Sequence, residues 1–207
     1  MLFRSIFHAD TVQTVGHFSI DLSNTHVDFI TGAGHKFHGP KGIGILYISQ
    51  RNKINPFIHG GGQERNMRAG TENIYGIIGF SKALEIAHQE HEKDSAYILS
   101  LKKYMKQRLI ETIPGVVFNG DPDGSSLYTV LSVGFPHSEK SEMLLFNLDI
   151  NHICVSGGSA CSSGANQGSH VINALTTEKQ STVRFSFSKY NTKAEIDKVV
   201  DSLQSLL

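Results

Sequence analysis

The strongest limit on the fold comes from an apolar run, Val27–Thr31, which ends in a Gly-Ala-Gly tripeptide and is followed closely by Lys36. Short apolar runs bounded by glycine predict buried strands, and Ser5–Ala9 and Gly44–Ile48 have the same character. Three such strands predict part of an α/β sheet, in which ligands gather beyond the strand ends. Lys36, at the exit of a predicted strand, is therefore a candidate for binding or catalysis.

The rest of the chain alternates between helical and strand-like apolar patterns. The expected elements are helices over 74–87 and 98–109, strands over 116–118 and 129–135, a helix over 141–147, a strand over 183–188, and a last helix that Thr192 caps, with Glu195 completing a capping box. The polar stretch around 88–94 marks the expected boundary between domains. We predict a partial large α/β domain over 1–90 and a small α+β domain over 91–207.

Composition argues against several classes of protein. The 207 residues contain 19 Lys and Arg and 19 Asp and Glu, so no general charge favours nucleic acid or an anionic membrane as a partner. No run of about 18 apolar residues is present to span a bilayer, and the first residues do not resemble a signal peptide. Two cysteines are too few for a disulfide framework, which favours a reducing cytoplasm.

The two cysteines have different surroundings. Cys161 lies among glycine, serine and alanine, which predicts an exposed and mobile loop cysteine available for chemistry. Cys154 lies between Ile153 and Val155 and is expected in the core, as an isolated apolar cysteine usually is. The sequence therefore favours Cys161 as the reactive thiol.

Two short motifs would together suit pyridoxal phosphate. Lys36 forms a Schiff base if its amine is neutral, and the glycines around it let a flat cofactor approach the backbone. Asp10, at the end of the first predicted strand, is suited to pair with the pyridine N–H, and Gln13 to reach the ring hydroxyl. Taken alone, a surface lysine and a helix-capping aspartate are the simpler interpretations.

The co-linear motifs resemble those of the cysteine desulfurases, which are class V, fold-type I pyridoxal-phosphate enzymes. The matching segments are His8-Ala9-Asp10 with Gln13, Gly34 to Gly42, Gly60 to Glu64 with Arg68 to Thr71, Gly158 to Ser163, and Val183 to Ser188 with Tyr190 to Thr192. Their order and spacing match along essentially the whole chain. The resemblance implies the C-terminal half of a fold-type I large domain, followed by a small α+β domain.

The resemblance assigns cofactor-binding roles to five residues. Lys36 matches the lysine that binds pyridoxal phosphate covalently, and Asp10 and Gln13 match the groups that tune its ring. His35 matches a residue beside the phosphate. Thr71 matches a threonine that reaches the phosphate of the partner subunit's cofactor, which implies a homodimer.

The resemblance also implies a reaction, the conversion of L-cysteine to L-alanine with the sulfur retained as an enzyme persulfide. Lys36 and Cys161 match its catalytic residues, and Arg184 matches the arginine that binds the substrate carboxylate through two parallel hydrogen bonds. The Gly-Ser-Ala-Cys-Ser-Ser sequence around Cys161 resembles that of the members with the longer mobile loop, which feed iron–sulfur scaffolds. The implied partners are therefore L-cysteine and a sulfur-acceptor protein.

The sequence departs from the family pattern in two respects. Ala33 stands where the family usually has a hydroxyl that contacts the phosphate. The family's phosphate-binding loop, ring-stacking histidine and nearby asparagine would precede Met1, so we expect a truncated or split form that represents the C-terminal part of the enzyme.

Three alternatives stay open at this point. A selenocysteine lyase of the same family would share these motifs, and an inactive remnant with a binding role would explain the two departures. A metal protein would use some of the 11 histidines, since His88 and His91 could share a helix face. No carboxylate–histidine cluster completes such a site, so we predict no metal.

Overall fold

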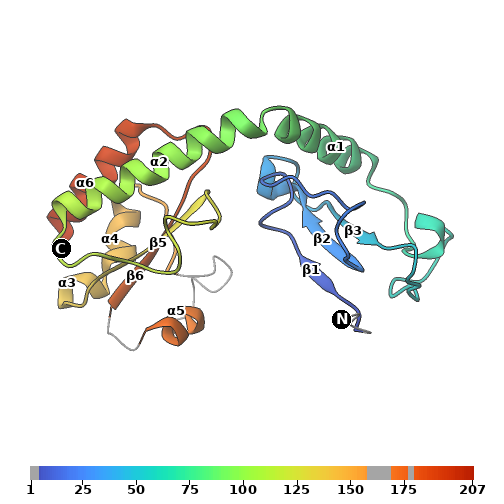
Figure 1. Ribbon diagram of the computed structural model, residues 1–207, viewed down its shortest axis with the longest axis horizontal. Coiled ribbons are helices and arrows are strands. Elements are labelled where there is room, and N and C mark those ends of the chain that lie inside the picture. Colours follow the sequence, from blue (N-terminus) through green and yellow to red (C-terminus); the bar gives the residue numbers. More distant parts are fainter. Residues whose placement is uncertain (1–4, 158–168, 177–179) are drawn as a thin grey trace. The chain divides into compact units, whose positions relative to one another are not determined.

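The computed structural model describes residues 5–157, 169–176 and 180–207 (Figure 1). Contacts divide the chain into two compact units, Met1–Glu92 and Lys93–Leu207. In chain order, the elements are β1 (His8–Asp10), β2 (Phe29–Ala33), the 3-10 turn η1 (Gly34–Phe37), β3 (Gly44–Ile48), η2 (Glu64–Asn66), α1 (Ile74–Gln89), α2 (His91–Thr112), β4 (Val117–Phe118), β5 (Val130–Pro136), α3 (Glu139–Glu142), α4 (Leu144–Ile150), α5 (His170–Leu175), β6 (Gln180–Ser186) and α6 (Lys193–Leu206).

The first unit is built on a three-stranded sheet in the order β1-β2-β3. β1 runs parallel to β2, with Asp10 opposite Thr31, and β2 runs antiparallel to β3, with Phe29 opposite Ile48. Because β1 and β2 are parallel, their carboxyl ends lie at the same edge of the sheet. Asp10 ends β1 and Lys36 follows β2, so both predicted cofactor residues come from this edge.

Helix α1 and the turns after β1 and β2 cover the sheet around a small core. Its buried members are Val15, Val27, Ile30, Phe37 and Phe80. Phe80 of α1 meets Phe37 edge to face, with the ring centroids 5.2 Å apart. The contact fixes the turn that follows β2 against the helix.

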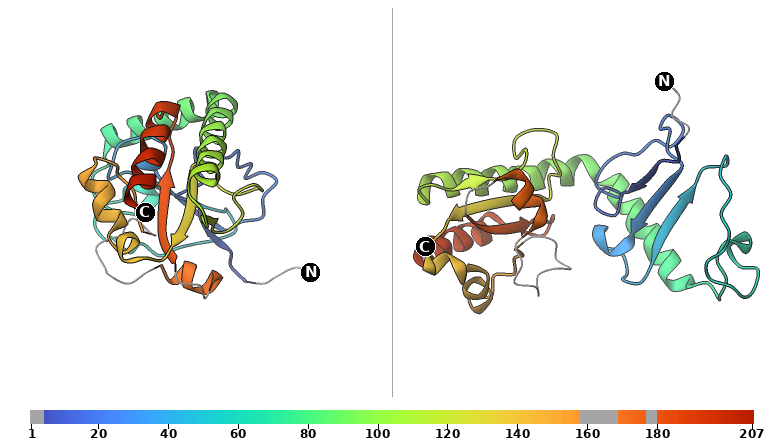
Figure 2. Two further views of the ribbon diagram at one scale, coloured as in Figure 1. Left: turned by 90° about the vertical axis from the view of Figure 1, so that its left-hand side faces the viewer. Right: turned by 90° about the horizontal axis from the view of Figure 1, so that it is seen from below.

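The second unit combines an antiparallel sheet, in the order β4-β5-β6, with helices (Figure 2). Helices α2 and α6 lie side by side and are joined through Asp197 of α6. Tyr104 of α2 donates a hydrogen bond to this carboxylate over 2.7 Å, and Arg108 of α2 lies 3.6 Å from it. The larger core of the molecule is in this unit, and its fully buried side chains include Leu101, Met105, Leu109, Leu131, Val133, Phe135, Leu144, Leu148, Val183, Val200 and Leu203.

Several predicted elements need correction. The first strand is His8–Asp10 rather than Ser5–Ala9, because Phe7 already uses its N–H to bind the side chain of Asp28. The helix predicted over 141–147 is two short helices, α3 and α4, separated at Met143. Helix α5 was not predicted, since its six residues are too few to form a clear apolar period.

None of the helices in the described ranges, 5–157, 169–176 and 180–207, is both long enough and apolar enough to cross a membrane.

Candidate functional site

Lys36 projects from a backbone turn that is fixed on several sides. The turn η1 ends at His38, whose φ of 66° is left-handed and whose N–H bonds the carbonyl of Gly34. Gly39 donates to the same carbonyl over 2.9 Å, and the neighbouring Phe37 is buried. Among the described residues, the amine of Lys36 has no hydrogen-bond or ion-pair partner, so it is available to a ligand.

Asp10 lies at the end of β1 with its carboxylate exposed. Its Oδ1 accepts a hydrogen bond from the N–H of Val12 over 3.0 Å, which turns the chain away from the strand. Thr11 bonds the carbonyl of Thr31 through both its N–H and its hydroxyl, so this turn is tied to the end of β2. Gln13 is exposed in the same region of turns, where no helix follows for Asp10 to cap.

His35 and Thr71 are both exposed. His35 precedes Lys36 in η1. Thr71 follows a loop that is closed by a hydrogen bond from the N–H of Gly70 to Oε1 of Gln63, over 3.1 Å. No hydrogen bond within the described part of the chain joins Thr71 to the turn of Lys36.

His17 is a residue near Lys36 that sequence reasoning missed. Its Nε2 lies 3.0 Å from the carbonyl oxygen of Lys36. Burial lowers the pKa of His17 below 6.5, and the nearby His38 and His91 lower it further, although the bond to Lys36 acts in the opposite direction. The contact spans 19 residues of sequence, and no motif or periodicity signals it.

The residues at this edge of the sheet fit the chemistry of pyridoxal phosphate. An available amine suits the aldehyde of the cofactor, and an exposed carboxylate suits its pyridine N–H. Ala33 is half-buried opposite Gly44 and offers no hydroxyl to a phosphate. These residues therefore offer partners for the aldehyde and the pyridine ring of the cofactor, whereas Ala33 offers none for its phosphate.

Arg184, on β6, lies between β5 and the segment that contains Ser156. It lies opposite Ser132 on β5, and on its other side it exchanges backbone hydrogen bonds with Ser156 over 2.6 and 3.3 Å. Its Nε is buried and has no hydrogen-bond partner among the described residues. Leaving a buried charged donor unpaired is costly, so this position favours an anionic ligand.

Cys161 lies outside the described residues, and its position in the site stays a prediction. The segment 158–168 that contains it begins just after Ser156 and Gly157, and Ser156 is paired with Arg184. The chain therefore enters the cysteine segment directly beside the arginine.

The second cysteine and the candidate metal site both require correction. Cys154 is exposed rather than part of the core, because Ile153 supplies the buried side chain at this point. His88 lies in α1 and His91 begins α2, so the two do not share one helix face. Within the residues that the structure describes, no cluster of histidine, cysteine or acidic side chains is arranged to hold a metal.

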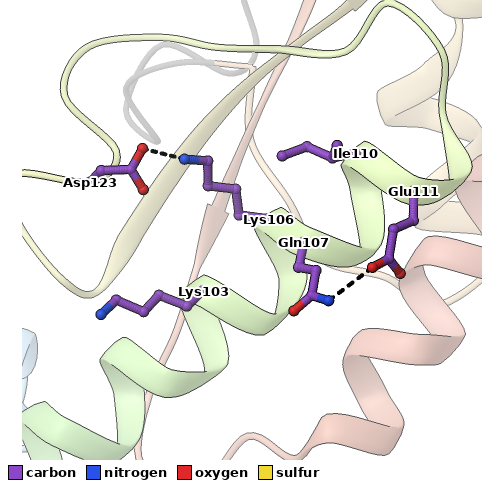
Figure 3. Close-up of a pocket in the computed structure, with 6 residues that line it drawn as sticks. All are labelled: Lys103, Lys106, Gln107, Ile110, Glu111 and Asp123. Carbon is purple, nitrogen blue, oxygen red and sulfur yellow. Dashed lines mark hydrogen bonds and ion pairs between the residues drawn. The ribbon is translucent and has the colours of Figure 1, made fainter.

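A shallow hollow is also present in the second unit (Figure 3). Two pairs of its side chains interact, since Lys106 pairs with Asp123 and Gln107 donates a hydrogen bond to Glu111 over 2.8 Å. It contains none of the predicted site residues and carries no functional argument. The lining residues are Lys103, Lys106, Gln107, Ile110, Glu111 and Asp123.

Comparison with known proteins gives a consistent picture. Residues 4–199 match the family described as aminotransferase class-V. The chain is 42% identical over 206 residues to "Cysteine desulfurase 2" of Trichormus variabilis, covering 98% of this chain and 51% of the relative. It is 40% identical over 204 residues to "Cysteine desulfurase IscS" of Dictyoglomus turgidum, covering 97% of this chain and 51% of the relative.

The fold is also similar to that of solved structures. A "NifS-like protein" superposes with a TM-score of 0.84 and 35% identity, over 97% of this chain and 52% of that structure. This likeness confirms the predicted mixed α/β fold of the fold-type I pyridoxal-phosphate enzymes. The chain spans about half the length of the curated relatives that it matches.

Proposed function

Because the chain belongs to the aminotransferase class-V family of pyridoxal-phosphate enzymes, we propose that it forms part of a cysteine desulfurase. The proposed reaction converts L-cysteine to L-alanine and leaves the sulfur as a persulfide on Cys161. The observation that carries the proposal is the buried Nε of Arg184, which has no hydrogen-bond partner among the described residues and lies on the strand bridged to Ser156, just before the cysteine segment. An amino-acid carboxylate is the ligand that such a guanidinium favours.

The cofactor would be held by residues of the 1–90 domain. Lys36 would bind it covalently, Asp10 would keep its ring nitrogen protonated, and Gln13 would contact the ring oxygen. His35 and the partner subunit's copy of the Thr71 side chain would contact the phosphate. When bound, pyridoxal phosphate supplies an electron sink for the pair of electrons left when the substrate α-carbon loses its proton.

Substrate binding and sulfur transfer would fall to the 91–207 domain. Arg184 would hold the carboxylate of L-cysteine, and Lys36 would remove the α-proton as a neutral amine. The Cys161 thiolate would attack the substrate sulfur, so that an S–S bond forms as the C–S bond breaks. The electron pair of the broken bond stays with carbon, which takes up a proton and leaves as alanine.

We further propose a cytoplasmic homodimer that passes the persulfide sulfur to an acceptor protein, such as an iron–sulfur scaffold. Dimerisation is supported by the exposure of Thr71, a residue that the family resemblance assigns to the partner subunit's cofactor. Cytoplasmic location is supported by the low cysteine content.

One observation favours a second candidate, a non-catalytic binding role. Ala33 offers no hydroxyl to the cofactor phosphate, so the cofactor would be held less firmly than the family pattern implies. An Ala33→Ser variant that binds pyridoxal phosphate no more tightly than the natural chain would remove this support.

Transfer of sulfur to Cys161 tests the proposed function. The full chain would be incubated with pyridoxal phosphate and L-cysteine, with alanine quantified and both cysteine peptides examined by mass. Alanine release with an added sulfur atom on Cys161 is expected, and the exposed Cys154 is the internal control. The same assay would be repeated on the chain joined to the first half of a relative. Activity of the joined protein alone would mean that this chain needs an added segment, and not that its own residues are inactive. Absence of alanine and persulfide in both would contradict the proposal.

A further inference from the structure

The carbonyl of Lys36 requires a partner from outside its own turn. The turn η1 covers only Gly34–Phe37 and closes through hydrogen bonds to the carbonyl of Gly34. Later carbonyls of so short a turn have no partner within it. The Lys36 carbonyl is satisfied by His17, whose Nε2 lies 3.0 Å away. Because a carbonyl only accepts, the proton of this bond is on Nε2.

His17 is itself held in place. Its N–H bonds the carbonyl of Thr14 over 3.0 Å, and its own carbonyl lies 2.8 Å from Nε2 of His91. The preceding Gly16 has a φ of 80°, and a Cβ there would come within 2.7 Å of the Phe37 side chain. The backbone before His17 therefore packs directly against η1, and only glycine allows this approach.

The charge state of His17 suits a fixed contact at neutral pH. Burial lowers its pKa below 6.5, so the ring is neutral at pH 7. The titratable groups that face it are His38, after η1, and His91, at the start of α2, and both act in the same direction when protonated.

We propose that His17 is a positioning residue for Lys36. By donating to the Lys36 carbonyl, it fixes the backbone from which the lysine amine is presented, and it does so without touching the cofactor or substrate. The inference rests on the proposed role of Lys36 and adds the residue that sets its orientation. Because the bond is made by this chain alone, its effect can be measured in the absence of cofactor.

The test is the reactivity of Lys36 in the full chain without cofactor. Wild type, His17→Leu and His17→Gln would be labelled briefly with a small amine-reactive reagent, and the ratio of Lys36 to Lys41 labelling read by peptide mass. We expect a several-fold change in this ratio for His17→Leu, because the carbonyl loses its donor. His17→Gln should restore the wild-type ratio, since an amide N–H replaces Nε2. A ratio unchanged in folded His17→Leu would overturn the proposal.

A second comparison covers the case in which His17→Leu does not fold. His17→Asn keeps the amide group but has a shorter side chain, so its N–H should not reach the Lys36 carbonyl, and the labelling ratio should change in the direction seen for loss of the donor. Wild-type labelling ratios in folded His17→Asn would overturn the proposal. Borohydride trapping of pyridoxal phosphate separates the two hypotheses: absence of trapping at Lys36 counts against the proposed function, whereas the labelling ratio still decides the role of His17.

Discussion

At the scale of single residues, two candidate functional side chains, Lys36 and Arg184, have nitrogen atoms without hydrogen-bond partners among the described residues. The amine of Lys36 has no bond within the described part of the chain, and the Nε of Arg184 is buried without one. Most buried polar atoms in proteins are satisfied, so an orphaned donor favours an absent ligand. The buried Nε of Arg184 is such a donor in the second unit, whereas Lys36 in the first unit is singled out by its match to the family motif.

Replacement of Arg184 should affect substrate binding more than folding. Loss of a charged hydrogen bond costs about 1.5–3 kcal/mol, so Arg184→Ala should lower kcat/KM for L-cysteine about ten- to hundred-fold. Arg184→Lys keeps the charge but not the two parallel donors and should recover only part of the loss. The measurement is alanine release in protein that shows desulfurase activity. A folded Arg184→Ala variant with wild-type kcat/KM would exclude the carboxylate role.

At the scale of secondary-structure elements, Asp28 ties the three strands of the first unit together. Just before β2, it accepts hydrogen bonds from the N–H of Phe7 over 2.9 Å and from the amide of Asn52 over 2.7 Å. Asn52 follows β3, and Phe7 leads into β1. These bonds lower the pKa of Asp28 below 3.8, with the bond from Asn52 contributing most and the charge of Arg51 least.

The Asp28 contacts give the stability of the chain a predictable pH dependence. Because the folded-state pKa is below 3.8, the stabilisation is present above pH 3.8 and is lost as pH falls through the folded value. Asp28→Asn should therefore unfold more easily than wild type at neutral pH, and the difference should shrink in strong acid. Urea unfolding at several pH values measures this, and a difference that stays constant with pH would contradict it.

Helix α2 offers a matched pair of positions for testing the second core. Leu109 is fully buried, whereas the neighbouring Ile110 is 57% exposed. Leu109→Ala should lower the free energy of unfolding by about 2–5 kcal/mol, while Ile110→Ala should change it by about 0.5 kcal/mol or less. Denaturant unfolding of both variants provides the comparison. Equal losses would show that this face of α2 does not contribute to the core as described.

Features that depend on local sequence could be predicted, and features that depend on distant contacts could not. The capping box of α6 was predicted and is confirmed, with the N–H of Thr192 bonded to Glu195 over 2.7 Å and the return bond at 3.3 Å. The bond between His17 and Lys36 joins two turns after different strands, so no spacing rule reveals it. The exposure of Cys154 depends on which side of its extended segment faces the core, which composition does not specify.

At the scale of the whole molecule, the proposed cofactor site involves a partner subunit. The chain covers about half the length of the relatives it matches. The family resemblance implies, as a prediction, that Thr71 of the partner subunit contacts the cofactor phosphate. Substantial apolar surface is exposed in the first unit, where Phe57 is 96% and Tyr75 is 90% exposed. Large exposed apolar side chains of this kind favour association with other protein surfaces.

Association should therefore be measurable in solution. We expect sedimentation velocity to give a species of twice the chain mass, and Thr71→Val to leave that mass unchanged while weakening pyridoxal-phosphate binding. The matched control is Thr25→Val, because Thr25 is also exposed but lies before β2. A monomer at all concentrations would contradict the dimer, and unaltered cofactor affinity in Thr71→Val would contradict the role of Thr71.

The central claim is that Lys36 is the residue that carries pyridoxal phosphate. The direct measurement is to add the cofactor to the purified full chain, reduce with borohydride and locate the pyridoxyl group by peptide mass, with Lys36→Arg as the control. The account predicts modification at Lys36 well above that at Lys41, and its loss in the variant. An adduct spread evenly over the lysines, or undiminished in Lys36→Arg, would contradict it.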